Sequence, residues 1–314
     1  MNIFRMRTWI ALATNTALVL IISFAFYTTL PIKTTKALLV PQGSIAHIIT
    51  QLTKQGYALS SIDKYILALM GKPQSGWVNI GETELNRIDF LYKLTTAKAK
   101  MQKITLIPGE TKTLFLDMLA KQLKLDREKL KTYYNAFSSF REAGIYADTY
   151  SVPFGISEKH LIYFLVTQSK KKYQKISKEV YGSYNKKQWL KVLTVASIVQ
   201  KEAANTKEMP IVASVIYNRL KKDMPLQMDG TLNYGKFSHI KVTPQRIRDD
   251  KTSFNTYKHK GLPTSPIGSV SLFALNAAMK PATTDYLYFM KNSQGVHDFT
   301  KSYKTHILNI KKAR

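Results

Sequence analysis

The residue best placed to carry chemistry is Glu202, near the end of a helix predicted over residues 188–203. Apolar side chains recur in this segment at spacings of three and four, which is typical of a buried or half-buried helix. Glu202 follows Val199 by three positions and Val195 by seven, so it falls on the apolar side.

A carboxyl group in that position is partly desolvated and lies close to the negative end of the helix dipole. Both effects favour its protonated form and raise its pKa, as a general acid working near neutral pH requires. The alternative is that Glu202 turns outward and pairs with a neighbouring lysine. Position alone leaves the two interpretations open.

The segments that follow Glu202 are loops rich in amide, hydroxyl and aromatic side chains, at residues 225–235, 253–257 and 261–268. Such a surface suits a sugar, whose hydroxyls need hydrogen bonds and whose apolar faces need flat rings. Each loop taken singly is equally explained by ordinary turn formation. Combined with a poised carboxyl group, the loops favour a carbohydrate site.

Other kinds of catalytic site find little support. The chain has no cysteine, which excludes disulfides, thiolate nucleophiles and cysteine-ligated metals. Its six histidines form no metal-binding motif, the stretch from Gly230 to Phe237 falls short of a phosphate loop, and no serine-hydrolase motif occurs. Ser61 and Lys64 match a short lactamase-type motif whose partners are missing. We therefore predict no metal and no cofactor.

The chain is strongly basic, with 47 Lys and Arg against 20 Asp and Glu and a net charge of +27. Such a surface attracts nucleic acid, anionic membranes or anionic wall polymers. The N-terminus decides between them. Trp9 to Leu30 carries no charge and, as a helix, spans about 33 Å, enough to cross a bilayer.

Arg5 and Arg7 precede this segment, so the tail is expected to stay cytoplasmic and the body to lie outside. A cleaved signal peptide is the alternative, but the apolar run is long and ends without a small-x-small site. An uncleaved anchor is the preferred interpretation. A translocated body makes nucleic acid an improbable partner.

The remaining chain alternates strand and helix patterns. Two apolar runs that end at Pro41 and Pro108 each lead into a helix, with Ser44 and Thr111 placed as caps. Further short elements complete a small αβ module over residues 36–103. Residues 112–224 are mostly helical, and a strand at 286–290 and a helix at 303–312 follow.

The motifs from residue 140 to 300 resemble those of the endolytic murein transglycosylases of the YceG/MltG family. The resemblance rests on ASIVQKEA, VASVIYNRL, QMDGTLNYG, NTY, GLPTSPIGS and YLYF, on Tyr146 to Tyr150, and on His297 with Phe299. It implies an α+β protein with four parts. These are a cytoplasmic tail (1–8), a single transmembrane helix (9–30), a LysM-like module (36–103) and a YceG-like catalytic domain (104–314).

The resemblance also implies the reaction. Glu202 matches the family's catalytic glutamate, and the family's QTDPT is Gln227-Met-Asp229-Gly-Thr231 here, without the proline. We expect Glu202 to act first as acid and then as base, so that MurNAc–GlcNAc bonds open with 1,6-anhydroMurNAc ends and no metal is needed. The residues expected to bind sugar are Gln227, Asp229, Thr231, Asn255 and Tyr257.

The resemblance further implies a bacterial inner-membrane protein with a periplasmic body. It would act on nascent glycan strands beside peptidoglycan synthases and so terminate their elongation. Two alternatives stay open: a non-catalytic, membrane-anchored scaffold that binds peptidoglycan, and a tethered binder of polyanions. The basic residues are mostly lysines spread along helices, which argues against the polyanion binder. A hydrolytic muramidase is a closer variant, distinguished by reducing ends in its products.

Overall fold

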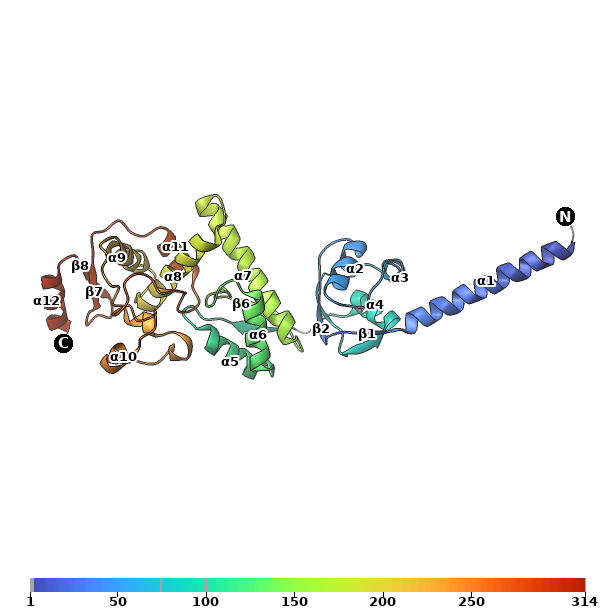
Figure 1. Cartoon of the computed structure of the whole chain (residues 1–314), viewed down its shortest axis with the longest axis horizontal. Coiled ribbons are helices and arrows are strands. Elements are labelled where there is room, and N and C mark those ends of the chain that lie inside the picture. Colours follow the sequence, from blue (N-terminus) through green and yellow to red (C-terminus); the bar gives the residue numbers. More distant parts are fainter. Residues whose placement is uncertain (1–2, 74, 99–100, 314) are drawn as a thin grey trace. The chain divides into compact units, whose positions relative to one another are not determined.

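The computed structural model describes residues 3–73, 75–98 and 101–313 and divides into two compact units. Unit 1 comprises residues 1–102 and 151–160, and unit 2 comprises residues 103–150 and 161–314. Helices and short two-stranded antiparallel sheets occur in the chain, which confirms the predicted mixed α+β class (Figure 1). Met1 and Asn2, which open the predicted tail, lie outside the described residues.

Unit 1 begins with α1 (Ile3–Thr29), a long helix with no acidic residue in its first turn. The apolar window from Arg7 to Thr29 is unburied and long enough to cross a membrane. This confirms the apolar helix predicted over residues 9–30. The other elements of unit 1 are β1 (Pro31–Lys33), β2 (Ala37–Val40), α2 (Ile45–Lys54), α3 (Asp63–Met70), β3 (Gly76–Asn79), β4 (Glu84–Asn86) and α4 (Arg87–Thr96).

The centre of unit 1 is a β2–α2–α3–β3 arrangement. Strands β2 and β3 pair antiparallel with Leu38 opposite Val78, and both side chains are buried. The predicted cap of α2 is confirmed, because the Ser44 side chain accepts a hydrogen bond from the backbone N–H of His47. β1 pairs antiparallel with β4, and β4 leads directly into α4. The assignment of this unit as a LysM-like module stays a prediction.

Unit 2 contains most of the helices and the candidate site. Thr111 caps α5 by accepting from the N–H of Leu114, as predicted. The elements that follow unit 1 in the chain are β5 (Met101–Thr105), α5 (Lys112–Leu123), α6 (Arg127–Phe137), β6 (Thr149–Pro153), α7 (Glu158–Tyr181), α8 (Lys186–Glu202), α9 (Met209–Lys221), η1 (Asp229–Leu232), η2 (Gly235–Phe237), α10 (Pro244–Asp249), α11 (Leu272–Met279), β7 (Tyr288–Lys291), β8 (His297–Thr300) and α12 (Tyr303–Ala313).

Helix α8 forms the core of unit 2. Its residues from Val192 to Val199 are buried on every side, and Trp189 is fully buried against Tyr173. Helices α9 and α11 pack on α8. Of the two predicted possibilities, a buried or a half-buried helix, the structure shows the buried one from Val192 to Val199, because neighbours cover most of its sides. This packing fixes the place where α8 ends, at Glu202.

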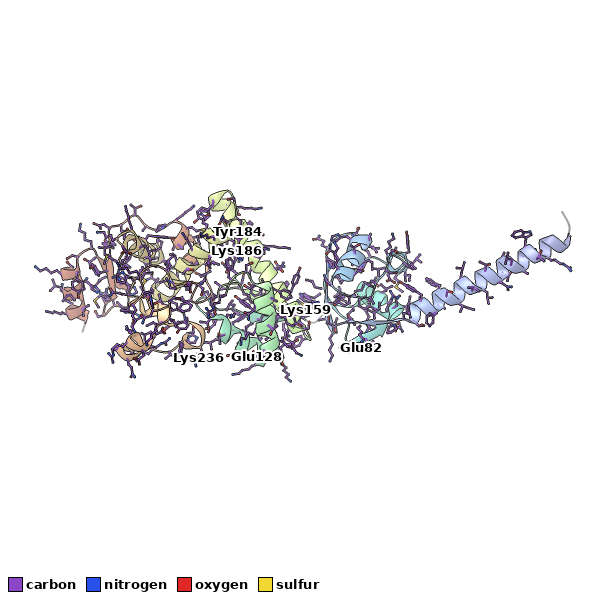
Figure 2. The ribbon with its side chains drawn as sticks, viewed as in Figure 1. Glu82, Glu128, Lys159, Tyr184, Lys186 and Lys236 are labelled. Carbon is purple, nitrogen blue, oxygen red and sulfur yellow. The ribbon has the colours of Figure 1, made fainter. Side chains whose placement is uncertain are left out.

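Charged side chains lie mostly at the surface, as Glu82, Glu128, Lys159, Lys186 and Lys236 do (Figure 2). A few are buried instead, and a buried charge needs partners or a change of protonation. Among the described residues, the buried acidic and basic side chains are Asp63, Arg87, Glu142, Glu208 and Arg219.

Candidate active site

Glu202 is the last residue of α8, and its side chain is half-buried at one end of a cleft. Its Oε1 accepts a hydrogen bond of 2.7 Å from the backbone N–H of Gly230, in η1. Among the described residues, no partner reaches Oε2. The carboxyl group is thus held by one oxygen, which leaves the other free to meet a ligand.

There is little room for a side chain at position 230 beside Glu202. A Cβ atom there would lie 2.7 Å from Oε1 of Glu202 and 2.8 Å from Cβ of Lys201. Both distances are shorter than a normal van der Waals contact, so a side chain at this position would displace the carboxyl group. The departure from the family's proline, noted in the sequence, therefore places a hydrogen-bond donor next to Glu202.

Burial raises the pKa of Glu202 to about 7. The hydrogen bond from Gly230 and the charge of Arg219 act in the opposite direction, while the nearby Asp229 carboxylate raises the pKa further. A carboxyl group with this pKa is present in both protonation states at neutral pH. It can therefore donate a proton and take one back under the same conditions.

The cleft has a volume of about 550 Å³ and lies wholly within unit 2. Four of the six predicted site residues line it, namely Glu202, Gln227, Asp229 and Tyr257. The Tyr257 hydroxyl donates a 2.7 Å hydrogen bond to Asp229. Burial, followed by that carboxylate, raises the pKa of Tyr257, so the hydroxyl keeps its proton.

Thr231 and Asn255 are buried and are not part of the cleft wall that surrounds Glu202. The Asn255 amide donates 2.8 Å bonds to two backbone carbonyls, those of Ile247 and Asp250. The Thr231 hydroxyl donates to the carbonyl of Met228 at 2.7 Å. The structure thus places these two predicted residues as supports of the loops that carry Gln227, Asp229 and Tyr257.

The rest of the cleft wall comes from side chains that were not predicted to bind sugar, although several of them lie in the motifs VASVIYNRL and YLYF. Arg219, in α9, donates from Nε to the Leu287 carbonyl at 2.6 Å and from Nη1 to the Leu226 carbonyl at 2.7 Å. It therefore ties the loop that leads to Gln227 to the strand that forms the wall. The remaining wall residues are Tyr288, Phe289, Met290, Lys291, His297, Tyr303, His306 and Ile310, from β7, β8 and α12.

A buried pair joins this wall to the loop after Glu202. Glu208 accepts from Nδ1 of His297 at 2.7 Å and from the His297 backbone N–H at 2.9 Å. It also accepts from the backbone N–H of Ala204 at 3.2 Å. Burial raises the pKa of Glu208, but these hydrogen bonds outweigh it and the pKa is lowered. Glu208 is therefore an anion that clamps β8 to the segment beside Glu202.

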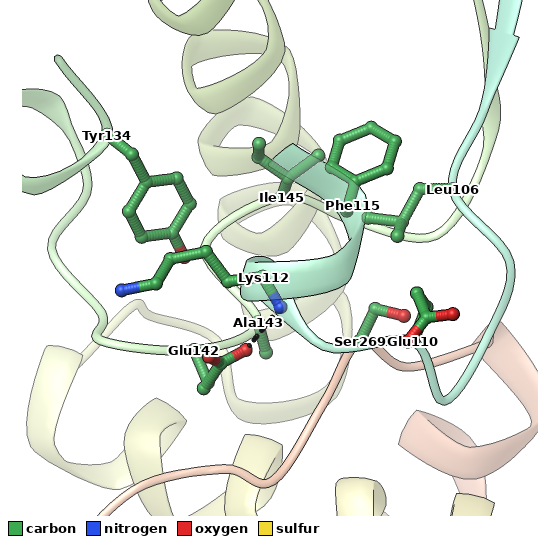
Figure 3. Close-up of a pocket in the computed structure, with 9 residues that line it drawn as sticks. All are labelled: Leu106, Glu110, Lys112, Phe115, Tyr134, Glu142, Ala143, Ile145 and Ser269. Atoms are coloured by element: carbon green, nitrogen blue, oxygen red, sulfur yellow. Dashed lines mark hydrogen bonds between the residues drawn. The ribbon is translucent and has the colours of Figure 1, made fainter. Parts of the chain in front are cut away.

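A second buried carboxyl group, Glu142, lies in a different pocket of unit 2 (Figure 3). It accepts a 2.8 Å hydrogen bond from the backbone N–H of Lys112, at the start of α5. Burial raises its pKa to about 7, as for Glu202. The surrounding cavity measures only about 10 Å³, which is room for about one water molecule. No sugar could reach this group.

The site thus consists of one carboxyl group with a raised pKa, open to a polar and aromatic cleft in a mixed α+β chain. Among the residues that the structure describes, no group of three metal-ligating side chains occurs. These features are typical of a site for acid–base chemistry. The chain belongs to the YceG-like family, whose profile matches residues 38–312.

Three comparisons sharpen this assignment. An endolytic murein transglycosylase of Bacillus subtilis is 40% identical over 131 residues, which are 41% of this chain and 36% of the relative. One of Streptococcus pneumoniae is 33% identical over 125 residues, or 38% of this chain and 23% of the relative. The matched segment thus spans about a third or less of these relatives.

A crystal structure of a putative yceG-like protein from Listeria monocytogenes has the same fold. It superposes with a TM-score of 0.57 at 27% identity and covers 88% of this chain and 99% of that one. The similarity to this structure extends well beyond the segment shared with the curated relatives.

Proposed function

We propose that the chain is a lytic transglycosylase that cuts glycan strands of peptidoglycan internally, between MurNAc and GlcNAc. The observation that carries the proposal is the carboxyl group of Glu202. Its pKa is raised to about 7, and its Oε2 atom, which has no partner among the described residues, is available to a ligand in a cleft of about 550 Å³. The names of the two relatives, endolytic murein transglycosylases, support the choice of substrate.

In the first step the protonated Glu202 donates its proton to the glycosidic oxygen. The bond from C1 of MurNAc to that oxygen breaks, and GlcNAc leaves with a hydroxyl group. Positive charge then develops at C1 and the ring oxygen. The Asp229 carboxylate, steadied by Tyr257, is the nearby anion that stabilises this charge.

In the second step the Glu202 carboxylate takes the proton from the C6 hydroxyl of the same MurNAc. The C6 oxygen attacks C1 and closes a 1,6-anhydro ring, so water is not consumed and Glu202 regains its proton. The attack is intramolecular, and its proximity replaces the second protein carboxylate that hydrolytic glycosidases use. The N–H of Gly230 holds the carboxyl group in place throughout.

We also propose that α1 stays attached as a single-pass anchor, with a cytoplasmic tail and a body in the periplasm. The end of α1 is built into the fold of unit 1. The Tyr27 hydroxyl bonds Ser60 at 2.6 Å and Asp63 at 3.0 Å, and the Arg87 guanidinium lies 4.3 Å from its ring centre. Removing α1 as a signal peptide would break these contacts and expose the buried Asp63–Arg87 ion pair.

The βααβ arrangement of unit 1 supports its assignment as a LysM-like module that binds glycan. Together, an anchor, a wall-binding module and an internal cut near the membrane would end the elongation of nascent strands. The partners that fit this role are peptidoglycan synthases in the same membrane.

The test is digestion of purified sacculi by the full-length protein in detergent, followed by mass spectrometry of the products. We expect 1,6-anhydroMurNAc ends that are absent with Glu202→Gln. Reducing ends would instead identify a hydrolytic muramidase. Binding to sacculi without any release of fragments would identify the alternative, a non-catalytic peptidoglycan-binding scaffold.

A further inference from the structure

Helix α3 of unit 1 carries an apolar stripe on its outer face. Ile62, Tyr65 and Leu69 are 48%, 64% and 90% exposed, which is unusual for large apolar side chains so close together. They are spaced by three and four positions, so they lie along one side of the helix. An exposed apolar face on a folded module marks a surface that another apolar medium covers.

The opposite side of α3 fixes the direction of this stripe. Asp63, Ile66 and Leu67 are buried, and Asp63 pairs with Arg87 of α4 at 2.6 Å. Because the buried face is anchored by an ion pair and by core packing, the helix cannot rotate to hide the stripe. Leu69 and its neighbours therefore stay on the outside of the module.

The start of α3 is joined directly to the end of the membrane-spanning helix. Tyr27, two residues before the end of α1, bonds the side chains of Ser60 and Asp63, which flank Ile62. The stripe therefore begins next to the point where α1 leaves the bilayer. Ile62 and Leu69 are seven positions apart, so the stripe extends only about 10 Å from that point.

We propose that the stripe of Ile62, Tyr65 and Leu69 is inserted into the membrane interface beside α1. The polar layer of a bilayer is about 5–8 Å thick on each side, which matches the reach of the stripe. Tyrosine favours this layer, and Lys64, whose ammonium lies 4.7 Å from the Tyr65 ring centre, suits anionic head groups. The proposal rests on the anchoring of α1 given above.

The experiment uses the absence of native cysteine. Full-length variants with one cysteine each, Leu69→Cys, Thr50→Cys or Leu18→Cys, are labelled with bimane. They are reconstituted in vesicles of phosphatidylethanolamine and phosphatidylglycerol. Thr50 is an exposed residue of α2, and Leu18 lies in the middle of α1 and is 56% exposed. Lipids with a spin label close to the head group and deeper in the chain serve as quenchers.

We expect the label at position 69 to lose most of its emission to the shallow quencher, and the label at 18 to lose most to the deep one. The label at 50 should be affected little. Equal quenching of the labels at 69 and 50, together with quenching at 18, would contradict insertion of the stripe into the membrane. It would leave the assignment of α1 as an anchor unchanged. No quenching at 18 would overturn the anchor itself.

A label at 69 that is shielded from aqueous iodide but not quenched by lipid would show that protein covers the stripe. A second copy of the chain would produce this result in proportion to the protein-to-lipid ratio. Either finding would contradict the proposal. Circular dichroism of each variant confirms the fold, which a change at an exposed position should leave unaltered.

Discussion

Unit 2 contains two glutamates, the half-buried Glu202 and the buried Glu142, whose pKa values are both raised to about 7 by desolvation. Each accepts one backbone N–H, from Gly230 or from Lys112. They differ in what surrounds them: a cleft of about 550 Å³ for Glu202, and a small pocket of about 10 Å³ for Glu142. A raised pKa therefore identifies a catalytic group only when a substrate can also reach that group.

The two groups also differ in which end of a helix lies beside them. Glu202 ends α8, where the helix dipole adds to the preference for the neutral form, whereas Glu142 faces the first N–H groups of α5, where the dipole favours an anion. Glu142 thus has a structural use, because it accepts the hydrogen bond from the backbone N–H of Lys112 at the start of α5. The Glu202 carboxylate is disfavoured by its place at the end of α8, and such a cost to stability is common at catalytic residues.

The largest effect should separate the two glutamates by activity. Glu202→Gln keeps the size of the side chain but has no proton to transfer, so the release of anhydro products should fall roughly 10²- to 10⁴-fold. Glu142→Gln, the matched control, should stay within about threefold of the wild type, since it only supports α5. Mass spectrometry of the products measures the activity of both variants. Full activity of Glu202→Gln would show that Glu202 is not the proton donor.

Gly230 offers the next largest effect. In Gly230→Ala the new Cβ would lie 2.7 Å from Oε1 of Glu202, so the carboxyl group must move, and we expect a loss of about 10- to 100-fold in kcat/KM. Gly235→Ala is the control, because a Cβ there meets nothing within 4 Å. That variant is strained at its φ of +55° and should lose about 1 kcal/mol of stability but keep its activity.

Stability should respond to pH at both glutamates in the same direction. Each folded-state pKa, about 7, lies above the ordinary value of 4.5, so the stabilisation is complete below about pH 4.5 and is lost as the pH rises through 7. The loss is up to about 3 kcal/mol per group. Glu142→Gln and Glu202→Gln should therefore raise the unfolding temperature at pH 8 much more than at pH 4.5.

Thermal unfolding of full-length protein in detergent, followed by circular dichroism, makes this comparison. The wild type measured at the same pH values is the reference. Variants that are destabilised at pH 8 would show that the carboxylate forms are the stabilising ones, contrary to the direction of both shifts.

The smallest effect concerns Tyr257. Removing its hydroxyl in Tyr257→Phe deletes the 2.7 Å hydrogen bond to Asp229, and we expect about a fivefold loss in kcat/KM, or about 1 kcal/mol. Tyr234→Phe removes the same kind of bond, 2.9 Å to Asp250, outside the cleft around Glu202. Equal losses in the two variants would show that the Tyr257 bond has no special role.

Much of the fold could be predicted because it depends on local patterns. Apolar spacing predicted α8 and its end near Glu202, and Ser44 and Thr111 were recognised as caps from their place before apolar periodic segments. These features depend only on residues that are close together in the sequence. Asp229 and Tyr257 were expected from the family resemblance, which places them in polar loops that follow Glu202.

What the sequence did not reveal depends on contacts between distant segments. The wall from β7, β8 and α12 reaches the cleft only through tertiary packing, and the clamp between Glu208 and His297 joins residues far apart in the chain. Thr231 and Asn255 have the side chains that sugar binding needs, yet the fold turns them inward to hold the loops. The burial of Glu142, in an irregular loop, leaves no periodic signal.

The most direct measurement of the proposed mechanism is the rate of anhydro-product formation by the full-length protein as a function of pH. If Glu202 must be protonated to act, kcat/KM falls tenfold per pH unit above an apparent pKa near 7, in the wild type and in Glu142→Gln alike. A rate that is constant or still rising at pH 9 would contradict the assignment of Glu202 as the proton donor.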